Sequence, residues 1–213
     1  MSPARLDGFL KLLDAGREAG VFNPWNERDD ANDGRLNGPA DRRERLRAHL
    51  SIRPARILIG EASGYQGCHV SGIPFTSERL IMSGAIPRIG SNGGARLSTR
   101  HVPWSEPSAT TVWGTLHALG IEQDTVLWNA FPWHPHKPGN LQSNRTPTRG
   151  EREQGLAILK VLLDTAPDAA VFAVGRHAQQ ALQDIGREAI ALRHPSMGGA
   201  TEFRRGLKVA LGR

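Results

Sequence analysis

The feature that most constrains the fold is an alternation of short apolar runs with longer amphipathic stretches along most of the chain. Four runs of apolar and β-branched residues have the length of buried strands: 56–60, 125–129, 169–175 and 189–193. Between them the apolar residues recur every three or four positions, which is the periodicity of a helix. Strands that alternate with helices form a parallel sheet covered on both faces. The sequence therefore predicts an α/β fold with three layers (α/β/α) around a central, mainly parallel four-stranded sheet.

Local signals indicate where several helices begin and end. Gly120 follows a helical pattern over 108–119 and suits a left-handed C-terminal position. Thr148 and Glu151 have the spacing of a capping box at the start of the next helix. Gly186 ends a further helix, and a last helix is expected over roughly 200–211.

The first fifty residues are expected to form a helical N-terminal extension of one single domain, 1–213. Leu6, Phe9, Leu10 and Leu13 mark one face of an amphipathic helix, and a charged helix follows at 41–50. No repeat or low-complexity tract divides the chain, whose 213 residues suffice for one sizeable core.

Composition narrows the class of protein. No run approaches the ~18 apolar residues of a membrane span, and the N-terminus lacks the apolar core of a secretory signal. Cys68 is the only cysteine, so the sequence excludes an internal disulfide and a four-cysteine cluster. We therefore expect a cytoplasmic protein from a reducing compartment, without membrane association.

The charge balance is basic. Lys plus Arg number 27 against 21 Asp plus Glu, a net charge of +6. The isoelectric point near 10.4 suggests a polyanionic partner, with nucleic acid first among them. An arginine-rich proteome would give the same balance, so charge alone leaves both explanations open.

Three polar motifs stand where predicted strands end. Gly60-Glu61-Ala62-Ser63-Gly64 follows the first strand, Asn129-Ala130-Phe131-Pro132 the second, and His194-Pro195-Ser196 the fourth. Ligands of open parallel sheets bind outside the carboxyl ends of the strands. We therefore expect the three motifs to converge on one pocket.

Each of these residues has a functional and a structural interpretation. Glu61 can orient or deprotonate a water, or it can be a solvated turn residue. Phe75, on a loop stiffened by Pro74, can stack on a base or fill the core. Asn129 can donate to O4 of uracil and accept from N3–H, a pattern that cytosine reverses, or it can form a turn. His194 can donate to a developing oxyanion or brace the turn before Pro195.

Two other features remain open at this level. His134 and His136 form a pair, but no third clustered ligand accompanies them, which disfavours a metal site. The segment 83–107 is rich in Gly, Ser and Arg, and it is too long for an ordinary connection, so we expect it to be functional or mobile.

Together the motifs resemble the uracil-DNA glycosylase superfamily, most closely its thermophile-type (family 4-like) iron–sulfur branch. The resemblance runs from about Arg56 to Phe203. It rests on Gly60-Glu61-Ala62-Ser63-Gly64, Gly72-Ile73-Pro74-Phe75, Leu127-Trp128-Asn129-Ala130, Gly139-Asn140, Asn144-Arg145-Thr146-Pro147-Thr148, Val174-Gly175-Arg176-His177-Ala178 and His194-Pro195-Ser196.

The resemblance implies roles for twelve residues. Glu61 and His194 are the implied catalytic residues. The implied uracil-binding residues are Gly60, Ala62, Tyr65, Phe75 and Asn129. The implied DNA-binding residues are Ser63, Arg145, Ser196, Met197 and Gly198.

The chain departs from the family pattern at several positions. The cluster cysteines are missing and Trp133 aligns with one of them, so no iron–sulfur cluster, metal or other cofactor is expected. Ala62 replaces an aspartate, which leaves Glu61 to supply the carboxylate. Gly64 replaces the tyrosine that excludes thymine, with Tyr65 one residue away. Gly198, preceded by Met197, replaces the leucine wedge.

The implied function is a DNA repair glycosylase that hydrolyses the N-glycosidic bond of deoxyuridine, releases uracil and leaves an abasic site. Its expected partners are single- or double-stranded DNA containing uracil and the abasic product, and we expect a monomer. Two alternatives remain: a protein that binds uracil or abasic sites in DNA with weak turnover, and a glycosylase for another deaminated base such as hypoxanthine.

Overall fold

The computed structural model describes residues 3–16 and 18–213. Its centre is a sheet of four parallel strands in the order β3 (Thr125–Phe131), β2 (Arg56–Ala62), β5 (Ala170–Val174) and β6 (Ile190–Leu192). The register sets Gly60 of β2 opposite Asn129 of β3, so the first two polar motifs begin side by side. The predicted four-stranded parallel sheet is confirmed.

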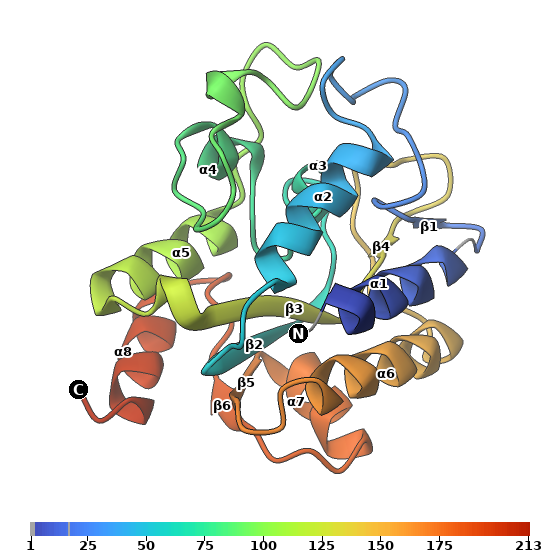
Figure 1. Cartoon of the computed structure of the whole chain (residues 1–213). Coiled ribbons are helices and arrows are strands. Elements are labelled where there is room, and N and C mark those ends of the chain that lie inside the picture. The colour runs from blue at the N-terminus through green and yellow to red at the C-terminus, as the bar shows by residue number, and fades with distance from the viewer. Residues whose placement is uncertain (1–2, 17) are drawn as a thin grey trace.

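Helices cover both faces of this sheet, as the alternation of apolar residues predicts. Figure 1 shows α5 (Pro107–Leu119) and α8 (Ala200–Ala210) on one side, and α1 (Pro3–Leu12), α6 (Arg149–Asp164) and α7 (Arg176–Asp184) on the other. In β2, Ile57 and Ile59 pack toward α6 and α7, whereas Leu58 packs toward α5. The three-layer architecture follows from this two-sided burial.

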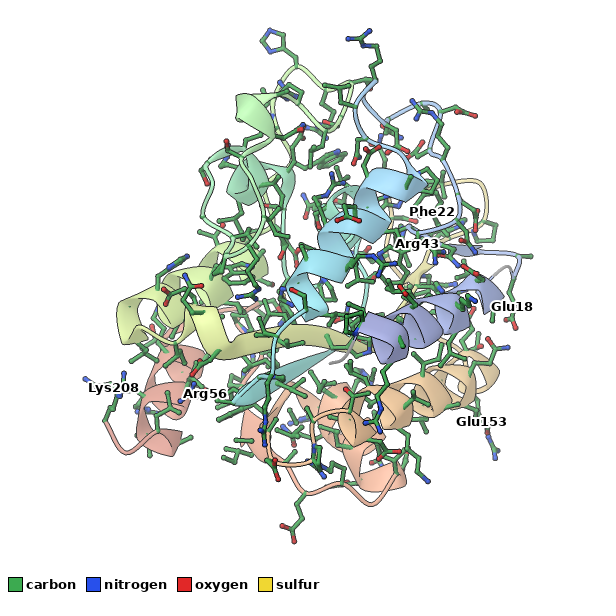
Figure 2. All side chains as sticks on the ribbon, in the orientation of Figure 1. Glu18, Phe22, Arg43, Arg56, Glu153 and Lys208 are labelled. Carbon is green, nitrogen blue, oxygen red and sulfur yellow. The ribbon has the colours of Figure 1, made fainter. Side chains whose placement is uncertain are left out.

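The outer faces of the covering helices carry charged residues. Figure 2 shows Lys208 of α8 and Glu153 of α6 extending away from the body of the protein, and both residues are exposed. Of the helices within residues 3–16 and 18–213, none is both long enough and apolar enough to cross a membrane.

The predicted helix ends are confirmed in detail. Gly120 ends α5 in the left-handed conformation at φ 62°, a conformation that glycine adopts at little cost. Thr148 accepts a hydrogen bond from the Glu151 amide, and the Glu151 side chain accepts one from the Thr148 amide, which completes the capping box of α6.

The first fifty residues are more than the helical extension that the sequence predicts. The short strand β1 (Val21–Phe22) pairs with β4 (His134–Pro135), so this segment is part of the fold. Between it and α2 (Pro39–Leu50) the polar stretch folds around the guanidinium of Arg42, which is fully buried. Arg42 forms an ion pair with buried Asp33 (Nη1–Oδ1 2.6 Å) and donates to the Glu27 carbonyl.

Helix α2 also protects the open edge of the sheet. β3 is an edge strand, and the Leu127 amide donates to Nε2 of His49 at 2.9 Å. Burial lowers the pKa of His49 to about 3, so the ring is neutral and can accept this bond. A side chain from α2 thereby satisfies an amide that an exposed edge would offer to another strand.

The long segment after α4 (Glu78–Met82) is folded onto a buried carboxylate. Glu78 accepts hydrogen bonds from the amides of Leu97 (2.8 Å), Ser98 (2.9 Å) and Trp104 (2.8 Å). Burial alone would raise the pKa of Glu78, but these bonds outweigh it and the pKa lies below its ordinary value. Apart from the 3-10 helix η2 (Asn92–Gly94), residues 83–106 contain no helix or strand, yet they are held in a defined path.

Candidate active site

A pocket of about 660 Å³ lies at the carboxyl ends of the strands. At this edge the chain leaves β2 toward β3 on one side and leaves β5 toward β6 on the other. Open α/β sheets bind ligands at such a point, where neighbouring connections diverge. The structure brings ten of the twelve predicted site residues to this pocket: Glu61, Ala62, Ser63, Phe75, Asn129, Arg145, His194, Ser196, Met197 and Gly198. The expected convergence of the three motifs is therefore confirmed, while the role of each residue stays a prediction.

Phe75 lies against Gly60 and is almost fully buried. A Cβ on Gly60 would lie 2.5 Å from Cζ of Phe75 and 2.6 Å from the side-chain amide of Asn129, so this position needs glycine. Phe75 also has a positive φ of 51°, a strained conformation for an aromatic residue. Gly60 thus lies behind the pocket wall and lets Phe75 and Asn129 approach the strand.

The amide of Asn129 is oriented by the backbone around it. In the amide orientation that gives both of its polar atoms a partner, its nitrogen donates to the Trp128 carbonyl at 3.3 Å and its oxygen accepts from the Ser63 amide at 3.2 Å. A carboxamide has two N–H donors and an oxygen with two lone pairs, so one donor and one lone pair remain. Asn129 therefore offers an adjacent donor and acceptor in a fixed order.

His194 is held in one tautomer. Its Nδ1 accepts a hydrogen bond from the Ser196 amide at 3.1 Å and lies 2.7 Å from Oγ of Ser196. Burial, helped by nearby Arg193, lowers the pKa of His194, so the ring is neutral at pH 7. A neutral ring whose Nδ1 accepts carries its hydrogen on Nε2, which leaves Nε2–H as a donor.

Glu61 borders both the pocket and a small crevice beneath α6 and α7. Its Oε1 is buried without a hydrogen-bond partner and lies 3.8 Å from Nε2 of His177. Burial raises the pKa of Glu61, while His177 and Arg152 oppose the rise. A carboxylate with a raised pKa and a free oxygen is suited to orient and deprotonate a water.

Some predicted DNA contacts occupy the rim of the pocket. Met197 is 90% exposed at the tip of the loop after β6, and its φ of 51° is strained. Gly198 follows it at φ 78°, and Ser196 is exposed beside it. An apolar side chain that protrudes from a tight turn suits insertion into a base stack.

Two other predicted DNA contacts are engaged within the protein. The guanidinium of Arg145 binds the Glu151 carboxylate through two contacts of 2.6 and 2.7 Å, and it also donates to the Gly20 carbonyl. Ser63 is buried, and its hydroxyl donates to the Pro132 carbonyl. Both residues line the pocket, but these bonds give them a structural role that the sequence does not reveal.

Gly60 and Tyr65 are the predicted site residues outside the pocket lining. The ring of Tyr65 packs edge-on against Trp104, with centroids 5.4 Å apart, in a neighbouring hollow. The guanidinium of Arg100 lies over the Trp104 ring at 3.6 Å. The loop after β2 therefore directs Tyr65 away from the place where it would exclude a methyl group from the pocket.

Sequence reasoning missed several pocket residues. Glu106 precedes α5 and lines the pocket, and the other missed residues include Gln66, Cys68, Thr111 and Asn144. Asn144 accepts a hydrogen bond from the Tyr65 amide at 3.1 Å, which joins the loops after β2 and β4. Pro107 marks the first turn of a helix, and a charged residue before it has no special pattern, so no local signal distinguishes Glu106 as a pocket residue.

The histidine pair has a structural role. His134 Nδ1 lies 2.9 Å from Nδ1 of His69, and Nε2 of His69 lies 2.9 Å from Oδ2 of Asp29. His136 is partly exposed and does not join this buried chain. Within the described part of the chain, no group of three or more His, Cys, Asp or Glu residues is arranged to hold a metal ion.

Trp133, the residue aligned with a cluster cysteine, is buried and donates from Nε1 to the Leu13 carbonyl at 3.0 Å. Cys68 is the sole cysteine and is itself buried. These residues do not fit an iron–sulfur cluster, which requires several cysteine thiolates.

Comparison with known proteins agrees with this geometry. The crystal structure of wild-type SMUG2 from Pedobacter heparinus superposes with a TM-score of 0.64 over 98% of this chain and 97% of that one, at 12% sequence identity. No curated protein sequence matches the chain. The family profile of the Uracil DNA glycosylase superfamily matches residues 48–208, which include all three motifs. The chain thus belongs to the uracil-DNA glycosylase superfamily, whose members are DNA glycosylases of base excision repair.

Proposed function

We propose that this protein is a monofunctional uracil-DNA glycosylase that cleaves the N-glycosidic bond of deoxyuridine in DNA. The observation that carries the proposal is the oriented amide of Asn129, which lines the same pocket as Phe75 and the neutral ring of His194. The resemblance of its motifs to the thermophile-type branch supports the same substrate, with Glu61 in place of the missing aspartate.

Base recognition combines stacking with a hydrogen-bond pattern. The base is inaccessible inside a duplex, so the nucleotide rotates out of the stack and enters the pocket. Phe75 stacks on the ring, which contributes about 1–3 kcal/mol by analogy with other aromatic platforms. The free N–H of Asn129 donates to O4 of uracil, and its free lone pair accepts from N3–H. Cytosine has the opposite pattern at both atoms and is rejected.

Bond cleavage depends on charge stabilisation. As the bond between C1′ and N1 breaks, its electron pair moves to the base and charge develops on O2. Nε2–H of His194 donates to that oxygen, and this preorganised donor acts mainly in the transition state. Glu61 orients a water whose oxygen bonds to C1′ while a proton passes to the carboxylate. The departing uracil anion takes up a proton from water and Glu61 returns its proton to water, so the net reaction consumes one water. The products are uracil and an abasic site, without a covalent intermediate.

Residues on the exposed rim of the pocket contact the DNA around the flipped nucleotide. Met197 inserts into the stack where the flipped nucleotide leaves a gap, and Ser196 and Gly198 lie along the same backbone turn. The net charge of +6 favours binding to the phosphate backbone. We further propose a cytoplasmic monomer that binds uracil-containing DNA and its abasic product.

The test is base release from defined oligonucleotides. Purified protein is incubated with single- and double-stranded DNA that carries uracil, hypoxanthine or a thymine mispair, and alkali then cleaves any abasic sites. We expect strand breaks at uracil with substoichiometric protein. Breaks at hypoxanthine alone would replace uracil by another deaminated base as substrate. Tight binding to uracil DNA without turnover would identify a binding protein and refute the proposed activity.

A further inference from the structure

Glu106 is a pocket residue for which the mechanism above has no use. It lines the same pocket as Asn129 and His194. Within residues 3–16 and 18–213 its carboxyl accepts no hydrogen bond and has no ion-pair partner. Glu106 is partly exposed where it lines the pocket, so its unpartnered carboxyl is open to a molecule that enters there.

The usual structural role of this position is absent. Glu106 is the N-cap of α5, a position where Ser, Thr, Asp or Asn ordinarily accepts from an amide of the first helical turn. Its side chain makes no such bond. The carboxyl instead lies over the loop after β2, because a Cβ on Gly67 would come within 1.9 Å of Oε2. Glycine at position 67 leaves the space that this carboxyl fills.

The backbone holds Glu106 firmly on both sides. The Trp104 amide, two residues earlier, donates to the buried Glu78 carboxylate at 2.8 Å. The Glu106 carbonyl accepts from the Thr110 amide at 3.0 Å in the first turn of α5. The side chain is therefore presented to the pocket from a fixed backbone, although it makes no bond of its own. Such preorganisation is what a recognition group needs.

We propose that the Glu106 carboxyl hydrogen-bonds the base that enters the pocket and helps to determine which bases are excised. This inference rests on the proposed glycosylase function and adds a second base-reading group to Asn129. A protonated carboxyl offers one donor and one acceptor, whereas a carboxylate offers acceptors only. Both exocyclic groups of uracil are carbonyl acceptors, so only the protonated form can donate to them.

The surroundings favour that protonated form. Burial raises the pKa of Glu106 to about 7. Cys68, the first residue of α3 (Cys68–Ser71), is a titratable group near Glu106, and burial raises the pKa of its thiol to about 12, so the thiol is neutral. His194, across the pocket, is neutral because its pKa is lowered. The guanidinium of Arg145 is bound to Glu151, so none of these groups supplies a free cation to Glu106.

The pH dependence follows from this chemistry. Excision of uracil needs protonated Glu106, so the rate falls as pH rises through about 7. Ionisation of Glu106 also places a negative charge beside the base, which opposes a developing negative charge on uracil. A base with an exocyclic amino group would instead gain a hydrogen bond to the carboxylate.

The experiment compares the parent protein with Glu106→Gln and Glu106→Ala under single turnover on a uracil oligonucleotide, from about pH 6 to about pH 9. Glu106→Gln keeps a donor and an acceptor at every pH, so we expect near-parent rates at acid pH and no loss toward alkaline pH. Glu106→Ala loses a hydrogen bond and should be slower by about 3- to 10-fold at acid pH. Glu153→Gln, on the exposed face of α6, is the matched control and should follow the parent.

Thermal unfolding of each variant separates loss of recognition from loss of the fold. Parent-like rates and pH profiles in a folded Glu106→Ala would overturn the inference while the proposed function stands. If the parent releases no base, the proposed function fails. The measurement is then the affinity of each protein for uracil-containing DNA compared with its affinity for thymine-containing DNA. The inference then requires that the preference for uracil DNA be lost in Glu106→Ala at acid pH, and an unchanged preference overturns it.

Discussion

Replacement of Gly60 by alanine tests the close packing on which the pocket depends. The added Cβ would lie 2.5 Å from Cζ of Phe75 and 2.6 Å from the side-chain amide of Asn129. Carbon atoms normally approach to about 3.5 Å, so the ring must move by about 1 Å or the strand must shift. Because Phe75 lines the pocket, a displaced ring would change the shape of the space that the base is proposed to occupy.

The expected cost combines stability and activity. Overpacking of a well-packed site costs about 1–3 kcal/mol, which lowers the melting temperature of a chain of this size by roughly 2–12 °C. Displacement of both base-contacting groups should lower uracil excision by ~10²-fold or more, because misplacement by about 1 Å has that effect. Thermal unfolding and single-turnover excision on the same preparation measure the two effects.

Gly114→Ala is the matched control for this prediction. Gly114 lies on the exposed face of α5, and a Cβ there meets no atom within 4 Å. Alanine inside a helix should raise stability by roughly 0.5–1 kcal/mol and leave excision unchanged. If Gly60→Ala matches the parent in both melting temperature and excision rate, the packing of Phe75 and Asn129 against this strand does not shape the pocket.

Four further changes test individual residues. Asn129→Asp should abolish uracil excision or shift it toward cytosine, because a carboxylate cannot donate to O4; an unchanged uracil rate excludes Asn129 as the base reader. Glu61→Gln should slow single turnover by ~10²–10⁴ with little change in DNA affinity. Burial raises the pKa of Glu61, and the ionised form is the active one, so the parent rate should fall as the pH drops through that raised pKa. The Gln variant should lack this decrease at acid pH. His194→Ala should lower the rate by ~10²–10³, with part of it restored in His194→Asn; equal rates in all three proteins remove the residue from the mechanism. Arg42→Met should cost about 3–5 kcal/mol in urea unfolding because it leaves a buried carboxylate unpaired. Arg53→Met, at an exposed ion pair, should change stability by less than about 1 kcal/mol, and a similar loss in both variants would contradict this account of Arg42.

Local pattern was sufficient to predict the sheet, most helices and the convergence of the motifs. A buried strand requires a short apolar run, and the Thr148–Glu151 capping box involves residues three positions apart. The three polar motifs meet because parallel strands present their carboxyl ends at one edge. These features depend on neighbours in sequence or on a general rule of topology, so the sequence alone contains them.

Tertiary structure decided how polar residues distant in sequence are paired. The stretch before α2 has the composition of a solvated loop, yet it folds around Arg42 and Asp33 because these two residues form an ion pair in the interior. Glu78 holds the long segment after α4 through amides about twenty residues away. Buried polar groups are stable only when every partner is in place, and composition does not specify the partner.

In the active site, too, some features follow from local sequence and others depend on tertiary contacts. Glu61, Asn129 and His194 could be predicted because each ends a recognisable strand or follows it directly. The tautomer of His194 depends on the turn that brings the Ser196 amide to Nδ1, and the orientation of the Asn129 amide depends on the loop that holds Ser63. The free carboxyl of Glu106 likewise depends on how its loop lies against the pocket. The sequence by itself determined which strand ends carry polar groups. Only the packing of those loops decided which hydrogen-bonding atoms at the pocket remain free for a ligand, because most buried donors and acceptors find partners within the protein.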